Sequence, residues 1–216
     1  MKIAILGAGN VGGALGAAWA RAGHMIAYGV SEPGKPAHAA VAAAAGGARV
    51  GTVADAVRDA DAIVLAVPWG AVPAAIAACG DLAGRIVLDA TNPLTFENGA
   101  LSLSLGFDTS GGEQVTALSK GAHVFKTLNQ VGYEVMADAS GFPTPPTMFV
   151  AGPDGAAKQT VLRLVADLGF AALDAGPIAI SRLLEPHAML WIHMAMAKGA
   201  PRDGAFALMR KTGAAG

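Results

Sequence analysis

The sequence predicts an α/β protein of the Rossmann type, with a doubly wound, mainly parallel sheet and a small C-terminal lobe ending in a long helix. Apolar stretches alternate with alanine-rich stretches, which is the βα order of a parallel sheet with right-handed crossovers. The first apolar stretch leads directly into the motif G-x-G-x-x-G. The last one, 178–198, is long enough for one extended helix.

The first βα unit carries the main functional signal. A short β-branched strand precedes the glycine motif, an alanine-rich helix over 11–22 follows it, and 23–29 is a helix stop plus a second strand. Gly7 permits the tight turn, Gly9 lets the backbone approach a pyrophosphate, and Gly12 allows the helix to pack closely on the strand. The predicted pyrophosphate loop comprises Gly7, Ala8, Gly9, Asn10, Val11 and Gly12.

The same residues allow a second interpretation, a secretory signal with Lys2, an apolar stretch and small residues around 17–20. The apolar core of such a signal would contain Asn10 and several glycines, which disfavour a membrane-partitioning helix. The signal would also include a strand that the rest of the sheet needs. We therefore favour the dinucleotide-binding interpretation.

The later elements follow from apolar runs, helix caps and turn residues. Thr52 can cap a helix over 53–60, and Asp154 is expected to be the N-cap of a helix ending at Leu168. The span 91–112 has several turn signals and is expected to be an irregular loop. The other expected elements are a loop at 30–36, helices at 37–45, up to 78 and at 178–198, and strands at 49–50, 62–67, 85–90, 124–129, 147–152 and 170–174.

Further cofactor-binding candidates lie at the predicted carboxyl ends of the strands, because ligands of doubly wound sheets bind there, at the topological switch point. Asn92 and Asn129 either contact a ligand or form turns and cap strands. Trp69 is expected to pack at the cleft wall, with a stacking platform as the alternative. The candidates at the strand ends are Val30, Ser31, Lys35, Val67, Pro68, Trp69, Asn92 and Asn129.

The composition excludes several classes of function. The 216 residues carry a formal net charge of -1 without a basic cluster, so neither nucleic acid nor a membrane surface is an expected partner. No run approaches the roughly 20 apolar residues that a membrane span needs. Cys79 is the only cysteine, which excludes an internal disulfide, fits a cytoplasmic protein and predicts a small buried hydrophobe. Catalytic triads and metal-ligand spacings are absent from the sequence, so we expect neither a metal nor a catalytic acid or base.

Several segments together form a distinctive pattern: ILGAGNVGGALG, AIVLAVPW, LDATNPL, VFKTLNQVGYEVM, TMFVAG and LDAGPIAISRLLEPHAMLWIHMA. With these segments the chain resembles the coenzyme F420-dependent NADP oxidoreductase family, in particular its short bacterial members. The resemblance implies hydride transfer between C4 of a nicotinamide and C5 of a deazaflavin in one cleft. It implies NADP as cofactor, with NAD as the alternative, and F420, a flavin or another planar small molecule as the redox acceptor. Such a transfer needs no protein acid or base at the moving hydride.

The chain departs from the family pattern after the second strand. Family members commonly carry Gly-Ser-Arg there to hold the adenosine 2'-phosphate, whereas this chain has Val30 and Ser31 after a glycine. Lys35 matches a family lysine and could supply charge, while Glu32 could bind a ribose hydroxyl in an NAD mode. The preference for NADP over NAD is therefore expected to be modest.

We place the acceptor pocket between the Asn92 and Asn129 loops and the terminal helix, because the nicotinamide end of a Rossmann cofactor lies beyond the second half of the sheet and only the C-terminal half can cover that edge. The candidate substrate contacts are Arg182, Leu190 and His193. His193 is otherwise a core histidine, and Arg182 requires an anionic partner, for which Glu185 and Asp174 are the protein candidates. The methionine-rich, tryptophan-containing helix also suits a homodimer interface. 

We divide the chain into an NAD(P)-binding region, 1–122, and a C-terminal lobe, 123–216, that completes the sheet and covers the cleft. Two other functions remain open. A β-hydroxyacid dehydrogenase or pyrroline-carboxylate reductase shares the glycine motif but needs a larger helical C-terminal domain. A non-catalytic module that senses redox state by binding NADPH would need the same cofactor loop and no acceptor.

Overall fold

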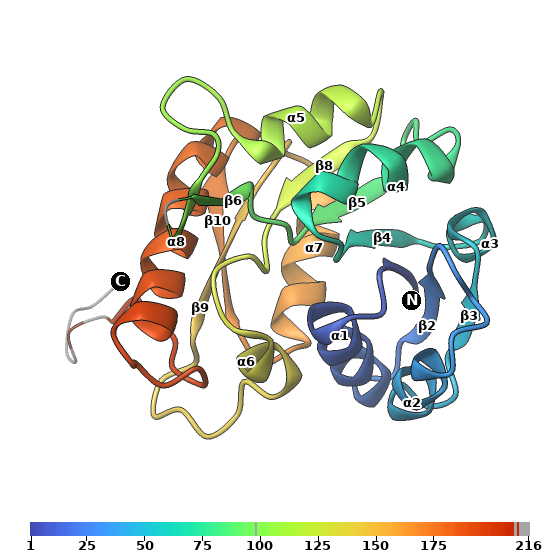
Figure 1. Ribbon diagram of the computed structural model, residues 1–216, viewed down its shortest axis with the longest axis horizontal. Coiled ribbons are helices and arrows are strands. Elements are labelled where there is room, and N and C mark those ends of the chain that lie inside the picture. Colours follow the sequence, from blue (N-terminus) through green and yellow to red (C-terminus); the bar gives the residue numbers. More distant parts are fainter. Residues whose placement is uncertain (98, 210, 212–216) are drawn as a thin grey trace.

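The computed structural model describes residues 1–97, 99–209 and 211. Its main sheet has eight strands in the order β10-β9-β8-β5-β4-β1-β2-β3, and helices cover both faces (Figure 1). The strands β1 to β5 and β8 are parallel, so the predicted doubly wound architecture is confirmed. The strands are β1 (Lys2–Leu6), β2 (Met25–Gly29), β3 (Arg49–Gly51), β4 (Ala62–Leu65), β5 (Ile86–Asp89), β8 (His123–Lys126), β9 (Thr147–Ala151) and β10 (Ala171–Gly176).

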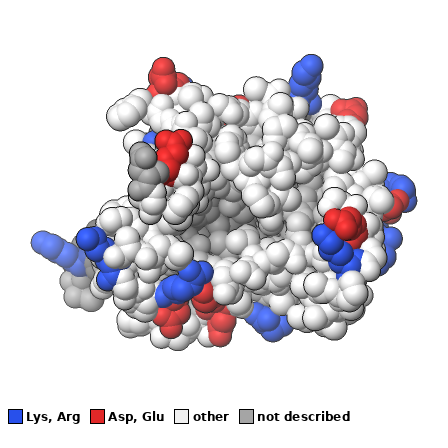
Figure 2. Space-filling model, in the orientation of Figure 1, with Lys and Arg blue, Asp and Glu red and all other residues white. Residues whose placement is uncertain are grey.

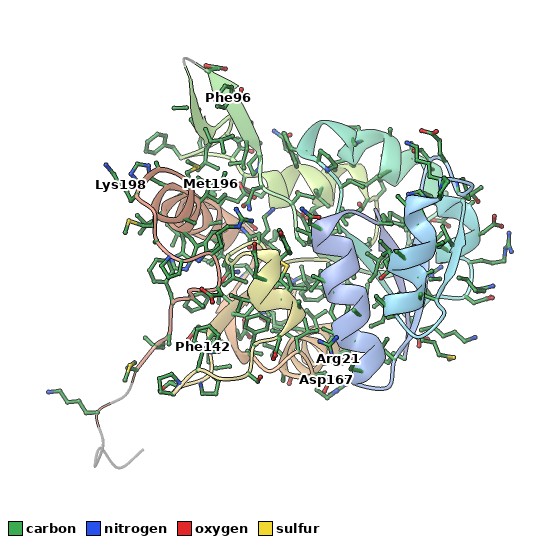
Figure 3. All side chains as sticks on the ribbon, turned by 60° about the horizontal axis from the view of Figure 1, so that its bottom comes forward. Arg21, Phe96, Phe142, Asp167, Met196 and Lys198 are labelled. Carbon is green, nitrogen blue, oxygen red and sulfur yellow. The ribbon has the colours of Figure 1, made fainter. Side chains whose placement is uncertain are left out.

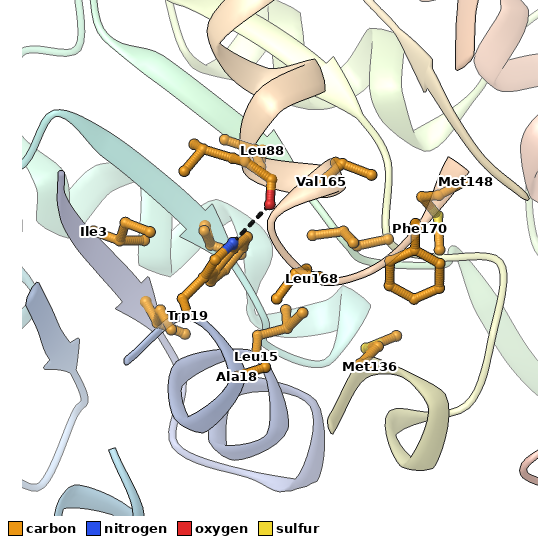
Figure 4. Packing of buried hydrophobic residues seen from close by; sticks show 14 of the residues in the cluster. Ile3, Leu15, Ala18, Trp19, Leu88, Met136, Met148, Val165, Leu168 and Phe170 are labelled. Atoms are coloured by element: carbon orange, nitrogen blue, oxygen red, sulfur yellow. Dashed lines mark hydrogen bonds between the residues drawn. The ribbon is translucent and has the colours of Figure 1, made fainter. Parts of the chain in front are cut away.

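Two apolar clusters, one on each face of the sheet, form the core. The cluster on the first face is built around Trp19 of α1, whose ring Nε1 donates a hydrogen bond to the carbonyl of Leu164 in α7 at 2.8 Å (Figure 4). The second cluster joins α3, α4 and α5 to the opposite face, with Cys79 among its buried members. The helices are α1 (Asn10–Arg21), α2 (Ala37–Ala44), α3 (Val53–Val57), α4 (Val72–Cys79), α5 (Gly111–Leu118), α6 (Tyr133–Ala137), α7 (Ala156–Ala166) and α8 (Ser181–Ala197), with short 3-10 turns at Trp69–Ala71 and Ile178–Ile180.

The C-terminal strands leave the parallel arrangement. β9 and β10 are parallel to each other, but β9 pairs with β8 in the antiparallel sense, through Lys126 and Ala151, the last residue of each strand. Most of β9 therefore extends beyond the carboxyl edge of the parallel strands. Because β5 pairs with β8, the sheet continues from the N-terminal region into the C-terminal one.

The span 91–112 is more regular than expected. It contains an antiparallel hairpin, β6 (Leu94–Glu97) and β7 (Ala100–Leu103), and the start of α5. The turn expected at 98–99 lies partly outside the described residues, because residue 98 is not described. The helix α5 carries a capping signal that we did not use: Ser110 Oγ accepts from the Glu113 amide at 3.2 Å and donates to its carboxylate at 2.7 Å.

Several predicted boundaries differ from the structure: the helix expected at 53–60 ends at Val57, the strand expected at 62–67 ends at Leu65, and the span 178–198 begins with a 3-10 turn before α8. Two further differences have a clear physical reason. The strand expected at 124–129 ends at Lys126, because Leu128 has a positive φ of 62°, which no strand residue adopts. The helix α7 has Gly155 rather than Asp154 as its N-cap, because the Asp154 carboxylate binds Lys158 instead. The predicted cap of α3 is confirmed, since the Thr52 hydroxyl accepts from the Asp55 amide.

Across the described part of the chain, none of the helices is long and apolar enough to cross a membrane.

Candidate functional site

The glycine motif has the backbone geometry of a pyrophosphate loop. Gly7 has a φ of +104°, and a Cβ at Gly7 would lie 2.5 Å from the carbonyl oxygen of Ala66. A Cβ at Gly12 would lie 2.0 Å from the carbonyl oxygen of Gly7. Any side chain at either position would clash with backbone, so both glycines are required by close packing.

Gly9 differs from the other two motif glycines. Apart from Gly9 and its chain neighbours, no described residue has a heavy atom within 4 Å of the position that a Gly9 Cβ would occupy. Gly9 is also the N-cap of α1, and no described side chain caps this helix. The first amide groups of α1 therefore face an open space, where a helix N-terminus favours an anion.

This open space is part of a cleft of ≈ 480 Å³. The cleft opens on the face shown in Figure 2, which is hollowed near its middle and bordered mainly by residues that are neither acidic nor basic. The described lining residues are all uncharged. They come from the ends of β1, β4 and β5 and from the start of β6: Gly9, Asn10, Val11, Ala66, Val67, Pro68, Trp69, Ala90, Thr91, Asn92 and Leu94.

The structure thus brings together most cofactor candidates from the first, fourth and fifth strands. Trp69 lines the cleft and also packs against the second apolar cluster. Ala66 and Leu94 were missed, although Ala66 is next to a predicted strand end and Leu94 lies within the expected loop. Small or apolar residues of this kind carry no chemical signal in a sequence.

Asn92 and Asn129 bind each other. The Asn92 side-chain amide donates to the Asn129 carbonyl at 2.9 Å, and the Asn129 side-chain amide donates to Asn92 Oδ1 at 3.0 Å. Asn129 itself is buried and is not among the described lining residues of the cleft. The pair joins the segments that follow β5 and β8, which is a structural role different from the turn formation and strand capping that we expected as the alternative to ligand contact.

The candidates at the adenosine end lie apart from the cleft lining. Val30 is buried, whereas Ser31 and Lys35 are exposed beyond the end of β2. The Lys35 ammonium forms an exposed ion pair with Glu32, with an N–O distance of 2.8 Å. An exposed pair of this kind contributes little to stability, so Lys35 can exchange its partner at small cost.

The partner predicted for Arg182 is wrong. Arg182 donates two hydrogen bonds, at 2.8 and 2.6 Å, to the carboxylate of Glu113 in α5, and to neither Glu185 nor Asp174. These hydrogen bonds hold the pKa of Glu113 below its ordinary value. Glu113 could not be selected from the sequence, because 69 positions separate it from Arg182.

The outer face of α8 also differs from expectation. His193 is exposed, because no described element packs over this face of α8. The core-histidine alternative is therefore wrong. Leu190 is 52% exposed. Neither residue, nor Arg182, is among those that line the cleft.

A buried ionic network lies beneath the cleft and was not predicted. The Lys126 ammonium, at the end of β8, lies 2.7 Å from Asp89 Oδ2 and 2.9 Å from Glu185 Oε1. It also donates to the carbonyl oxygen of Thr91 at 2.9 Å. All three charged side chains are almost completely buried. A lysine at the end of a strand is usually expected to be exposed, and for this reason the sequence did not predict the network.

A search for groups of three or more His, Cys, Asp or Glu side chains that could hold a metal ion finds none among the described residues.

Comparisons with known proteins find a matching family model and solved structures that are similar to this chain. The family model described as NADP oxidoreductase, coenzyme F420-dependent, matches residues 2–93. A candidate F420-dependent NADP reductase from Arthrobacter sp. FB24 is similar over 97% of this chain and 100% of its own, with 32% identity and a TM-score of 0.88. A hypothetical protein, SMa0349 from Sinorhizobium meliloti, is 29% identical over 86% of this chain and 90% of its own, with a TM-score of 0.75.

A more distant structure shares the fold alone. The reductive aminase from Aspergillus terreus, solved in complex with NADPH and ethyl levulinate, is 18% identical with a TM-score of 0.66. The match covers 91% of this chain but only 62% of that enzyme. 

Proposed function

This chain belongs to the coenzyme F420-dependent family of NADP oxidoreductases, and on that premise we propose that it transfers a hydride between NADP(H) and a planar ring acceptor such as a deazaflavin or a flavin. The observation that carries the proposal is the open, uncapped start of α1 at Gly9, which faces an uncharged cleft at the carboxyl edge of the sheet.

The residues of the cleft fit a dinucleotide. The amides at the start of α1 would hold the pyrophosphate, because they lack side-chain partners and the helix dipole favours an anion there. Ser31 and Lys35, beyond β2, would approach the adenosine ribose and its 2'-phosphate. The nicotinamide would lie toward the ends of β4 and β5, near Trp69 and Asn92.

The cleft also suits the chemistry. When bound, the cofactor would supply a hydride from C4 of its reduced nicotinamide ring, and the acceptor ring would take up this hydride. Any proton that the reduced acceptor also needs would come from solvent. The protein needs only to hold two flat rings in contact and exclude water. Uncharged walls made of Val67, Pro68, Trp69 and Leu94 are compatible with that task.

We also propose that the protein is a homodimer and that the outer face of α8 forms the interface. This face consists of Leu183, Leu190 and Met194, which recur at helical spacing and are 66%, 52% and 41% exposed. Phe96, on the β6–β7 hairpin that contacts α8, is exposed as well (Figure 3). Contiguous exposed apolar side chains of this kind mark interaction surfaces.

NADPH binding to Gly9 variants tests the cofactor site. Gly9→Asp would place a carboxylate against the phosphates, so we expect it to abolish NADPH binding while the protein stays folded, because the added Cβ lies in open space. Gly9→Asn is the matched control, equal in size but uncharged, and we expect it to weaken binding less. Fluorescence titration with NADPH and circular dichroism provide the measurements.

The assignment of the loop fails if folded Gly9→Asp binds NADPH as tightly as the wild type. The assignment of the reaction is tested separately, by NADPH oxidation against F420, FMN, FAD and riboflavin. Tight NADPH binding without turnover of any of these acceptors would support the non-catalytic redox-sensing module instead.

A further inference from the structure

We propose that the buried network of Asp89, Lys126 and Glu185 is a positioning device for the nicotinamide end of the cleft. By this proposal Lys126 is a positioning residue, because it acts through the segment that follows β5. The proposal rests on the proposed function, since it concerns the same cleft. It adds a role for three residues that do not line the cleft.

Lys126 connects three segments that are distant in sequence. Its ammonium reaches the Asp89 carboxylate at the end of β5, the Glu185 carboxylate in α8 and the carbonyl oxygen of Thr91, at distances of 2.7, 2.9 and 2.9 Å. The contacts with Asp89 and Thr91 are hydrogen bonds, and the contact with Glu185 is an ion pair. Two donors of the Lys126 ammonium group are therefore fixed by the segment that follows β5, while its charge is also neutralised from α8.

Each carboxylate of the network is held by backbone amides as well. Asp89 Oδ1 accepts from the Thr91 amide at 2.9 Å and from the Thr91 hydroxyl at 2.6 Å. The two oxygens of Glu185 accept from the amides of Gly111 and Gly112, each at 3.0 Å, at the N-terminus of α5. A helix N-terminus favours a carboxylate, which compensates for the second negative charge of the network.

The network ends at the cleft. Thr91 and Asn92 line the cleft, and Thr91 is held through its amide, hydroxyl and carbonyl groups by Asp89 and Lys126. Asn92 is in turn joined to Asn129 by two hydrogen bonds. The cleft wall next to the proposed nicotinamide position is thereby tied to α5 and α8.

Stability alone does not account for this arrangement. Replacing a buried ion pair by apolar side chains of similar size is often neutral or stabilising, so three buried charges are a poor way to strengthen a core. What the network does provide is one defined geometry, since any displacement of Thr91 removes hydrogen bonds from the buried charges of Asp89 and Lys126. A precise geometry is what hydride transfer between two rings requires.

The chain offers a matched control in Lys158. This lysine of α7 is also almost completely buried, and its ammonium lies 2.6 and 2.8 Å from the carboxylates of Asp154 and Asp174. Neither Lys158 nor its partners line the cleft. Lys158→Met therefore removes a buried ammonium group, whose carboxylate partners are exposed, at a place without a connection to the proposed nicotinamide position.

The experiment compares two probes, NADPH and 2',5'-ADP, which has the 2'-phosphate and the adenosine but no nicotinamide. In Lys126→Met and in Glu185→Gln we expect the dissociation constant for NADPH to rise about tenfold, while that for 2',5'-ADP stays within about twofold. The fluorescence of bound NADPH should shift toward that of the free cofactor, because its nicotinamide is less enclosed. Lys158→Met should change neither the ratio of the two dissociation constants nor the fluorescence of bound NADPH.

Glu185→Gln keeps the experiment decisive if Lys126→Met does not fold, because it conserves the size of the side chain while it removes the charge and one of the two acceptor oxygens. Folded network variants with an unchanged ratio of the two dissociation constants and unchanged NADPH fluorescence would overturn the proposal and leave the network a purely structural feature. A wild-type protein that binds neither probe would instead overturn the proposed function, and this inference with it.

Discussion

At the scale of single residues, burial decides the chemistry of side chains outside the cleft. Cys79, the last residue of α4, is buried, and its thiol donates to the carbonyl oxygen of Ala75 at 3.2 Å. Burial raises the pKa of Cys79 to about 11. The thiol therefore stays protonated near neutral pH, which agrees with its predicted role as a small hydrophobe.

His187 makes the stability of the protein depend on pH. Its ring lies against Phe149 and Phe206, with centroid distances of 6.0 and 5.0 Å, and burial lowers the pKa of His187 below the ordinary value of 6.5. As the pH falls, His187 of the unfolded chain is therefore protonated at a higher pH than His187 of the folded protein. The contribution to stability is present above pH 6.5 and is lost as the pH falls through the folded-state pKa.

We therefore expect the melting temperature to fall between pH 7 and pH 5, and His187→Phe to reduce this slope. Thermal unfolding followed by circular dichroism at several pH values measures it. His193→Phe is the control, because His193 is exposed on the same helix. Equal slopes in the wild type and in His187→Phe would contradict the assignment.

At the scale of elements, the loop between β2 and α2 is expected to set the preference between NADPH and NADH. Ser31 stands where family members place an arginine, and a lysine is a mobile point charge compared with a bidentate guanidinium. We expect Ser31→Arg to raise the preference for NADPH about tenfold and Lys35→Ala to lower it. Titrations with both cofactors test this, with the exposed Lys120→Ala as control.

If neither Ser31→Arg nor Lys35→Ala changes the ratio of the two affinities, the 2'-phosphate is recognised by other residues or not at all.

The helix α8 carries the prediction on assembly. Leu190→Glu places a charge in the proposed interface, so we expect the wild type to be a dimer and the variant a monomer that still binds NADPH. Light scattering after size exclusion gives the mass. Leu118→Glu is the control, because Leu118 is comparably exposed on α5.

A monomeric wild type would contradict the interface. A dimeric Leu190→Glu that has lost acceptor turnover but not NADPH binding would instead support the acceptor pocket predicted around Leu190.

At the scale of the whole molecule, the order of the strands decides where the cleft forms. The sheet runs from β1 through β2 and β3 to one edge, and through β4 and β5 toward the other. The switch point therefore lies between β1 and β4, and the segments after these strands line the cleft. Any ligand held there contacts both halves of the sheet.

Cofactor binding should consequently stabilise the whole fold. At about 100 times the dissociation constant, a ligand that binds only the folded state adds about 2.7 kcal/mol. For a domain of this size we expect NADPH to raise the melting temperature by about 5 to 10 °C. Gly9→Asp, which loses the cofactor, should show no such rise, and an unchanged wild type would argue against NADPH binding.

Much of this protein follows from its sequence. The order of strands and helices up to β5, the glycine loop and the cleft positions at the ends of β1, β4 and β5 all come from local signals. Alternation of apolar runs with helical stretches is a property of neighbouring residues, and parallel strands bring their carboxyl ends to one edge. Family membership followed as well, because its motifs are short and continuous.

Only the tertiary structure decided which charged side chains meet. Glu113 is 69 positions from Arg182, and Lys126 joins Asp89 of β5 to Glu185 of α8, so no local pattern specifies these partners. The end of β8 was decided in the same way, because the Leu128 backbone takes a positive φ, which costs roughly 1 kcal/mol, to place a completely buried side chain in the core. Local sequence determines which elements can form. Which charges become buried, and where the backbone is strained, depends on contacts that exist only once those elements have packed.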